Sequence, residues 1–255
     1  MMPNNIRYLY DADTGIELIF CDNSTISYPL HNHVSVFTIG MVLDGSILLT
    51  TNQSTKVYDK NQTFVILPYM PHSISTHDSY TLLSLCIDKS LIYKCTIDTV
   101  KNNIIHLVGD ALDENRINQT QVIQLLNCLS MFTDMPTLTS GIDNPFIDGL
   151  KKQLELCPED KFSVDEMAQN AFISKYHFIR SFKSEVGLTP HQFQVQNRIR
   201  KAQRLISEAE TITEVALTTG FCDQSHFIRQ FEKYVGLTPS AYKLSLGTFK
   251  HDAID

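Results

Sequence analysis

Histidines at positions 31, 33 and 72 are the residues of this chain best suited to bind a metal ion or a small molecule. Alternate side chains of an extended strand point to the same face, so His31 and His33 would present two imidazoles side by side. Neutral imidazoles ligate divalent transition-metal ions, and they also hydrogen-bond to organic ligands. The residue types therefore favour a binding site in the first half of the chain and leave both kinds of ligand open.

A second set of polar side chains lies in a segment that occurs twice, at 174–190 and 223–239. The two copies are 49 residues apart, ten of their seventeen positions are identical, and both end in Val-Gly-Leu-Thr-Pro. His177 and Arg180 of the first copy recur as His226 and Arg229. The recurrent histidines fit packing or capping as well as ligand contact. A duplicated segment indicates a duplicated role.

Each copy has the start and stop signals of a helix of roughly three turns. Ser174 and Asp223 are good N-cap residues, and Gly187 and Gly236 stand where a left-handed C-terminal turn needs them. Apolar residues recur at i, i+4 and i+8 and predict one buried stripe per helix. They are Phe178, Phe182 and Val186, then Phe227, Phe231 and Val235.

Shorter periodic stretches at 163–171 and 211–219 precede the two helices. Both begin with the capping-box spacing, in which Ser or Thr is followed three positions later by Glu. A short helix, a break and a second helix form a helix-turn-helix, so the sequence predicts two of them. Gly220 lies in the second break, whereas the first break has Phe172. Because glycine permits positive φ, we expect the first turn to close differently from the second.

A basic helix is predicted between the two units, over 193–206. Its apolar residues fall on one stripe, and about 14 residues would make it roughly 21 Å long, a rigid spacer between the units. The segment contains Arg198, Arg200, Lys201 and Arg204 and no acid. This charge suits contact with phosphates.

The segment from about 147 to 246 resembles the AraC/XylS family of bacterial transcription regulators. The resemblance lies in the two units in register, the basic linker helix and the pattern Gly220-Phe221, Ser225-His226-Phe227 and Gly236-Leu-Thr-Pro239. It implies sequence-specific binding to double-stranded DNA, with side chains of the second helix of each unit in the major groove. The residues it implies are Lys175, Tyr176, Ile179, Arg180 and Lys183 in the first unit; Gln224, Ser225, Ile228, Arg229 and Lys233 in the second; and Arg198, Arg200 and Lys201 on the linker helix.

The first 88 residues consist of short strand-like runs separated by turn residues, which predicts a small antiparallel barrel or sandwich. The runs are 16–20, 36–39, 46–50, 56–58, 64–67 and 80–85. With His31 and His33 before the second run and His72 after the fifth, this half is similar to the cupin-like effector domains of AraC-type regulators. The resemblance implies that the three histidines converge, either on a divalent metal ion or around a small-molecule pocket, and no cofactor is certain.

The expected architecture is therefore α+β, with five consecutive parts. A cupin-like antiparallel β-barrel (1–88) is followed by a helical connector (89–132), a linker (133–146), an all-α domain with two helix-turn-helix units (147–246) and a tail (247–255). The connector is predicted from helix-spaced apolar residues, and in the family a helix here often forms a dimer interface. A homodimer is therefore one expected state.

Charge and cysteine content limit the other functions. The net charge is −7, yet residues 1–146 hold 7 Lys and Arg against 14 Asp and Glu, and residues 147–255 hold 14 of each. The acidity thus lies in the first part, and weak nonspecific DNA affinity is expected. The six cysteines form no close pair, and we see no apolar run of membrane-spanning length and no signal-peptide pattern. These features predict a cytoplasmic protein that does not contact a membrane.

The sequence as a whole predicts a ligand-controlled transcription regulator, and not an enzyme. The resemblance implies promoter DNA, a small-molecule or metal effector and RNA polymerase as partners, and activation in preference to repression. Two alternatives stay open: a metal-dependent cupin enzyme with a helical appendage, and a constitutive DNA-binding protein with a vestigial sensor.

Overall fold

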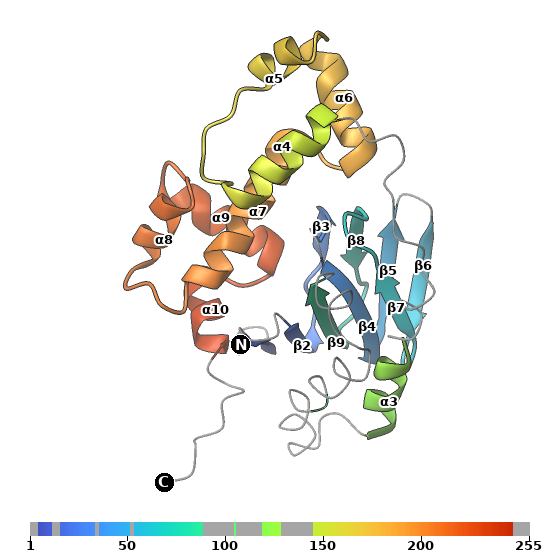
Figure 1. Cartoon of the computed structure of the whole chain (residues 1–255). Coiled ribbons are helices and arrows are strands. Elements are labelled where there is room, and N and C mark those ends of the chain that lie inside the picture. Colours follow the sequence, from blue (N-terminus) through green and yellow to red (C-terminus); the bar gives the residue numbers. More distant parts are fainter. Residues whose placement is uncertain are drawn as a thin grey trace.

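The computed structural model has a β half and a helical half, joined by a segment that includes one further described helix (Figure 1). It describes residues 5–11, 16–33, 36–51, 54–88, 105, 119–128 and 145–246. The β half is the strand-containing part within 5–88, and the helical half is 145–246. The tail, most of the predicted connector and the predicted linker up to residue 144 lie outside the described residues, while residues 145 and 146 of that linker begin helix α4 (Pro145–Leu156).

Two antiparallel sheets form the β half. The first has the order β1-β2-β9-β4-β7, and the second the order β3-β8-β5-β6. The strands are β1 (Asn5–Asp11), β2 (Ile16–Ser24), β3 (Tyr28–His31), β4 (Val36–Asp44), β5 (Ser46–Thr51), β6 (Thr55–Asp59), β7 (Thr63–Ile66), β8 (His72–Ser75) and β9 (Tyr80–Asp88). The antiparallel β-rich half is as predicted, and closure of the two sheets into a barrel stays a prediction.

Each of the six predicted runs lies on a strand, apart from residue 67, which follows β7, and β1, β3 and β8 were not predicted. Two of these matter for the histidines. His31 is the last residue of β3, and His72 is the first residue of β8. The two residues are partners in the β3–β8 ladder. Backbone pairing, and not loop conformation, thus brings the first histidine beside the third.

Helix α3 (Gln119–Asn127) is the described part of the predicted connector. It contacts β4, and Leu125 is fully buried there. This stretch of the predicted connector is therefore helical and packs against the β half.

Seven helices are described in the helical half. They are α4 (Pro145–Leu156), α5 (Val164–Asn170), α6 (Lys175–Val186), α7 (Pro190–Leu205), α8 (Ile212–Thr218), α9 (Gln224–Val235) and α10 (Pro239–Ser245). Helices α5 and α6 form the first helix-turn-helix unit, α8 and α9 form the second, and α7 connects them (Figure 1). This is the predicted order.

The predicted caps fix the helix ends. Ser174 and Asp223 accept hydrogen bonds from the backbone N–H groups three residues on, and Gly187 and Gly236 both have φ of 81°. The prediction for the first turn is wrong. Phe172 has φ of 56° and so takes the left-handed conformation that Gly220 takes, with φ of 83°, in the second unit. A non-glycine residue pays only about 1–2 kcal/mol for this conformation, which the packing of two helices can outweigh.

The two units are anchored differently. One hydrophobic cluster joins the second unit and α7 to the β half, and includes Tyr8, Ile199 and Phe231. The first unit has its own cluster around Phe182 and Phe193, with Tyr69 of the β half packed against it. The β half therefore contacts both units, through separate sets of residues.

Two predictions about the environment concern cysteines and membrane spans. Cys21, Cys86, Cys128, Cys157 and Cys222 are free thiols. Within the described segments no helix has the length and apolar character that crossing a membrane requires.

Candidate ligand pocket and DNA-reading surface

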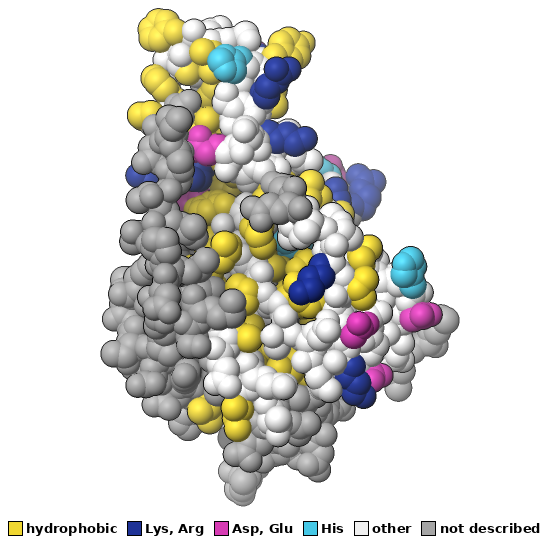
Figure 2. Space-filling view, turned by 90° about the vertical axis from the view of Figure 1, so that its right-hand side faces the viewer, with side chains coloured by type: hydrophobic (Ala, Val, Ile, Leu, Met, Phe, Trp, Pro, Cys, Tyr) yellow, Lys and Arg dark blue, Asp and Glu magenta, His cyan; other side chains and the backbone are white. Residues whose placement is uncertain are grey.

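The predicted contact residues of the first unit lie on the outer face of α6. Lys175, Arg180 and Lys183 are exposed, and Tyr176 is 83% exposed. Ile179 is half-buried. Hydrophobic side chains also gather at the end of the molecule that α5 and α6 form, beside Lys and Arg side chains (Figure 2). The first unit thus presents both apolar groups and hydrogen-bond donors to solvent.

The second unit presents a more polar face. Gln224, Ser225, Arg229 and Lys233 are exposed, whereas Ile228 is half-buried against the hydrophobic cluster. The Gln224 amide oxygen accepts a hydrogen bond from the Thr213 hydroxyl at 3.1 Å, which orients it.

The recurrent histidines differ between the units. His177 is exposed, while His226 is half-buried with its ring centroid 5.5 Å from that of Phe221. Packing accounts for His226 and does not account for His177.

The basic residues of α7 make internal contacts. Arg198 donates to the carbonyls of Pro158 and Gly220, both at 2.7 Å, and so joins the loop before α5 to the turn of the second unit. Lys201 forms an ion pair with Glu159 at 2.5 Å. Arg200 faces the β half. Helix α7 is packed between the two units and the β half, so most of its residues are buried or half-buried. Contact of Arg198, Arg200 and Lys201 with DNA phosphates stays a prediction.

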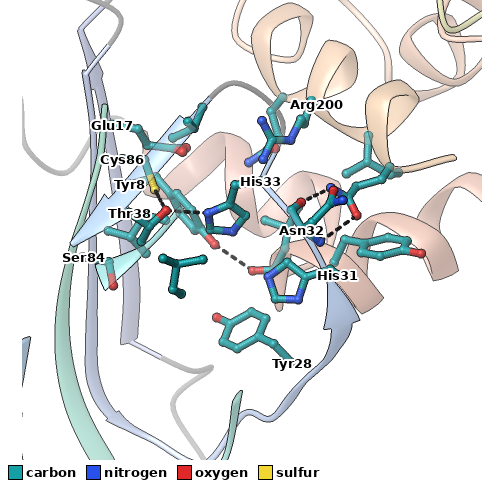
Figure 3. A pocket seen from close by; sticks show the side chains of 18 of the residues that line it. Tyr8, Glu17, Tyr28, His31, Asn32, His33, Thr38, Ser84, Cys86 and Arg200 are labelled. Carbon is teal, nitrogen blue, oxygen red and sulfur yellow. Dashed lines mark hydrogen bonds between the residues drawn. The ribbon is translucent and has the colours of Figure 1, made fainter. Parts of the chain in front are cut away.

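A cavity of about 440 Å³ lies between the β half and helices α7, α9 and α10. Its apolar walls come largely from the sheets, and polar groups come from both halves. The polar lining includes Glu17, Tyr28, His31, Asn32, His33, Thr38, His72, Ser84, Gln196, Arg200 and Gln203. Figure 3 shows Arg200 entering from the helical half while Glu17, Thr38 and Cys86 enter from the strands.

The three predicted histidines meet in this cavity and form the histidine cluster, His31, His33 and His72. One ring nitrogen from each can be chosen so that all three lie within 4.8 Å of one another. The rings of His31 and His72 are 4.2 Å apart between centroids. The predicted convergence is therefore present in the structure.

Hydrogen bonds set the tautomers of two cluster members. The Nδ1 atoms of His31 and His72 lie 2.7 and 3.0 Å from the carbonyl oxygens of Pro29 and Met70. A carbonyl only accepts, so each Nδ1 carries the proton and each Nε2 keeps its lone pair. The Nε2 of His72 is buried and, within the described part of the chain, has no hydrogen-bond partner.

Burial keeps the cluster neutral. It lowers the pKa of His31 to about 3 and that of His72 to about 4, and the pKa of His33 also lies well below its usual value. Neighbouring imidazoles lower the pKa values of His31 and His33 further. Neutral rings with free lone pairs can coordinate a metal ion or accept hydrogen bonds from a ligand.

Two charged residues of the cavity were not predicted to lie there: Glu17 was not singled out from the sequence, and Arg200 was predicted to contact DNA. Burial raises the pKa of Glu17 to about 7, and the positive charges of Arg200 and Arg204 partly offset this effect. Burial also lowers the pKa of Arg200. Strand alternation placed Glu17 beside buried neighbours, but its position opposite Arg200 depends on how the two halves pack.

The sequence analysis also missed the polar contacts between the halves. Asn32 donates from Nδ2 to the Val186 carbonyl at 2.9 Å, and its side-chain oxygen accepts from Gln196 Nε2 at 3.0 Å. Tyr8 donates to the carbonyl of Val235 at 2.7 Å. Val186 and Val235 are equivalent residues of the duplicated segment, so the β half binds the same backbone position in both units.

Comparison with known proteins supports the predicted family. Residues 167–245 match the family model of a helix-turn-helix domain. The HTH-type transcriptional regulator MtrA of Neisseria gonorrhoeae is 39% identical over 64 residues, 25% of this chain and 21% of MtrA. The probable transcriptional regulator LumQ of Photobacterium leiognathi is 36% identical over 130 residues, 49% of this chain and 52% of LumQ. The chain thus spans about a fifth and about half of these two relatives.

Two other comparisons extend over most of the chain. The uncharacterized HTH-type transcriptional regulator YbfI of Bacillus subtilis is 25% identical over 245 residues, 86% of this chain and 88% of YbfI. Ligand-free ToxT of Vibrio cholerae has a TM-score of 0.58 at 14% identity, over 93% of this chain and 99% of ToxT. A structure of ToxT with an unsaturated fatty acid bound has a TM-score of 0.55 at 14% identity, over 99% and 100%. At 14% identity, the similarity to ToxT shows a shared fold and nothing more.

These findings agree with the two duplicated units and the β-rich first half, and the relatives they name are transcription regulators. Residues 167–245 therefore match a helix-turn-helix domain of the kind that transcription regulators carry, and the chain is similar over most of its length to YbfI and, in fold, to ToxT.

Proposed function

We propose that the protein binds specific sites in double-stranded DNA through α6 and α9, and that a ligand in the interdomain cavity controls this binding. The observation that carries the proposal is the duplication, in which two capped helices of equal length each turn a polar face to solvent. Side chains near the N-termini of these helices, such as Tyr176 and Gln224, would contact base edges in the major groove. Promoter DNA is the natural target of such a protein.

The cavity supports control by a small molecule. Its lining comes from both halves, so a bound ligand would favour one arrangement of the units over another. ToxT, whose fold this chain shares, is known with an unsaturated fatty acid bound. We infer that this chain also takes an effector in its N-terminal half, at the cavity beside Arg200.

A divalent metal ion is the second candidate for the cavity, and the histidine cluster favours it. Three neutral imidazoles lie close together, the backbone fixes the Nδ1–H of two of them, and a buried Nε2 of His72 has no partner among the described residues. Metal-ligating histidines commonly donate their second ring N–H to such carbonyls. Within a regulator, the ion would bridge β3 and β8 or help to hold an effector.

The remaining features belong to the same proposal. The β half would form a cupin-like barrel over 1–88, the connector at 89–132 would support a homodimer, and 147–246 would bind DNA. The protein would act in the cytoplasm, as an activator that contacts RNA polymerase.

Exposed residues of α6 provide the test. Tyr176→Ala and Arg180→Ala should each weaken binding to DNA selected by the wild-type protein from a random library, by about 1–3 kcal/mol. Thermal stability should change little, because both side chains are exposed. Fluorescence anisotropy gives the dissociation constants, and Glu208→Ala, an exposed change in the turn after α7, is the control. Unchanged affinity in both α6 variants would refute the assignment.

A further inference from the structure

Each histidine of the cluster is next in sequence to a residue that contacts the C-terminal end of α6. Asn32 lies between His31 and His33, and Pro71 precedes His72. We propose that a metal ion in the histidine cluster orders these two segments and thereby fixes the end of α6, with Asn32 as the positioning residue. The inference rests on the proposed metal site.

Asn32 directs its polar groups towards the helical half. Its side chain donates to the Val186 carbonyl at 2.9 Å, and its backbone N–H donates to Gln196 Oε1 at 3.3 Å. Gln196 Nε2 donates to both oxygens of Asn32. Asn32 is fully buried and Gln196 nearly so, so loss of either partner would leave buried polar groups unsatisfied.

The second histidine segment contacts the next residue of the same helix end. A β-carbon at Gly187 would overlap Cγ of Pro71, so only glycine allows the two segments to lie this close. Tyr69, two residues earlier, donates from its backbone N–H to the carbonyl of His33 at 2.7 Å. The two histidine segments therefore hold each other as well as the end of α6.

Side-chain alternation gives the loop its two functions. His31 and His33 turn their rings towards each other in the cavity, whereas the Asn32 side chain, at the edge of the same cavity, is hydrogen-bonded to the helical half (Figure 3). An ion bound by both imidazoles would restrict the backbone on either side of Asn32. It would also fix β8 through His72, and so hold Pro71 against Gly187.

The equivalent contacts of the second unit come from two tyrosines. The Val235 carbonyl accepts from Tyr8, which is on β1, and Gly236 lies against the ring of Tyr28. Tyr28 is on β3, three residues before His31, and the two ring centroids are 6.3 Å apart, so the second unit meets the cluster through one ring contact and not through hydrogen bonds from a residue next to a histidine. The metal should therefore act on the first unit more than on the second, and this asymmetry distinguishes the proposal from general stabilisation.

Hydrogen exchange measured by mass spectrometry tests the proposal on the full chain, with Zn²⁺ as the probe. In the metal-free wild type, saturating Zn²⁺ should slow exchange across 183–196 by about fivefold or more, with a smaller effect across 232–239. Asn32→Ala should still bind zinc but lose the slowing across 183–196. Tyr8→Phe removes the matching hydrogen bond of the second unit, and this variant should keep the slowing of exchange across 183–196. If Asn32→Ala does not fold, Gln196→Met, which leaves the histidine segments intact, should reduce the same effect.

The possible failures are distinguishable. If zinc does not bind, or if its binding does not require His33, the proposed metal site is wrong and this inference falls with it. If zinc binds through His33 but Asn32→Ala retains the full slowing across 183–196, the metal site stands and the role of Asn32 is refuted. Equal slowing in both units of the wild type would also refute it.

Discussion

Phe182→Ala should destabilise the helical half by about 3–5 kcal/mol, because it empties a fully buried position of α6. The Phe182 side chain is 0% exposed and packs edge-on against Phe193, with ring centroids 5.7 Å apart. The substitution removes a ring that ties the first unit to α7. Since whole domains are stable by only about 5–15 kcal/mol, a large fraction of the variant should be unfolded in mild denaturant.

Urea unfolding followed by far-ultraviolet circular dichroism measures this loss, and Phe172→Gly is its matched control. Phe172 is 94% exposed and has φ of 56°, so its replacement removes little buried surface. Relief of the left-handed strain and the added freedom of unfolded glycine should offset each other to within about 1 kcal/mol. Similar losses in the two variants would contradict the assignment of Phe182 to the core.

Zinc should stabilise the metal-free protein, and His33→Ala should abolish that effect. An ion that binds only the folded state adds about 3–4 kcal/mol at 100 to 1,000 times its dissociation constant. Without His33 the cluster keeps only two imidazoles, which would weaken binding strongly. Thermal unfolding with and without Zn²⁺ measures the shift, and metal analysis of protein purified without a histidine tag gives the stoichiometry.

His77→Ala controls for histidine loss in general. His77 is exposed in the turn between β8 and β9 and lies outside the cluster, so this variant should keep the zinc effect. A metal-free wild type that gains no stability from any divalent ion, yet responds to a small molecule, would eliminate the metal and leave the effector pocket.

Local signals in the sequence predicted the helical half well. Ser174 and Gly187 mark the ends of α6 because capping and left-handed conformation depend on one or two residues. Strand β3 was missed because Pro29 interrupts its pattern, and β8 because only one of its four residues, Ile74, is apolar, whereas the equally short β7 has three. Proline is tolerated there because β3 is an edge strand.

Contacts between the halves could not be predicted from local patterns. Helix α7 carries basic residues on several sides, and periodicity does not tell which side meets another domain. Arg200 was therefore predicted to contact phosphate, but it lines the cavity opposite Glu17. Asn32 was passed over for the same reason, since its partners Val186 and Gln196 are more than 150 residues away.

The spacing of the DNA contacts tests the central claim most directly. Two recognition helices held by α7 should enter successive major grooves on one face of the duplex, about 34 Å apart. Five base pairs inserted between the two half-contacts of a selected site turn one of them to the opposite face. The account predicts that the affinity of the wild-type protein for the inserted DNA falls to that of a single half-contact. The selected site without the insertion keeps full affinity. Equal affinity for both DNAs would show that one unit alone reads the site, and would contradict the account.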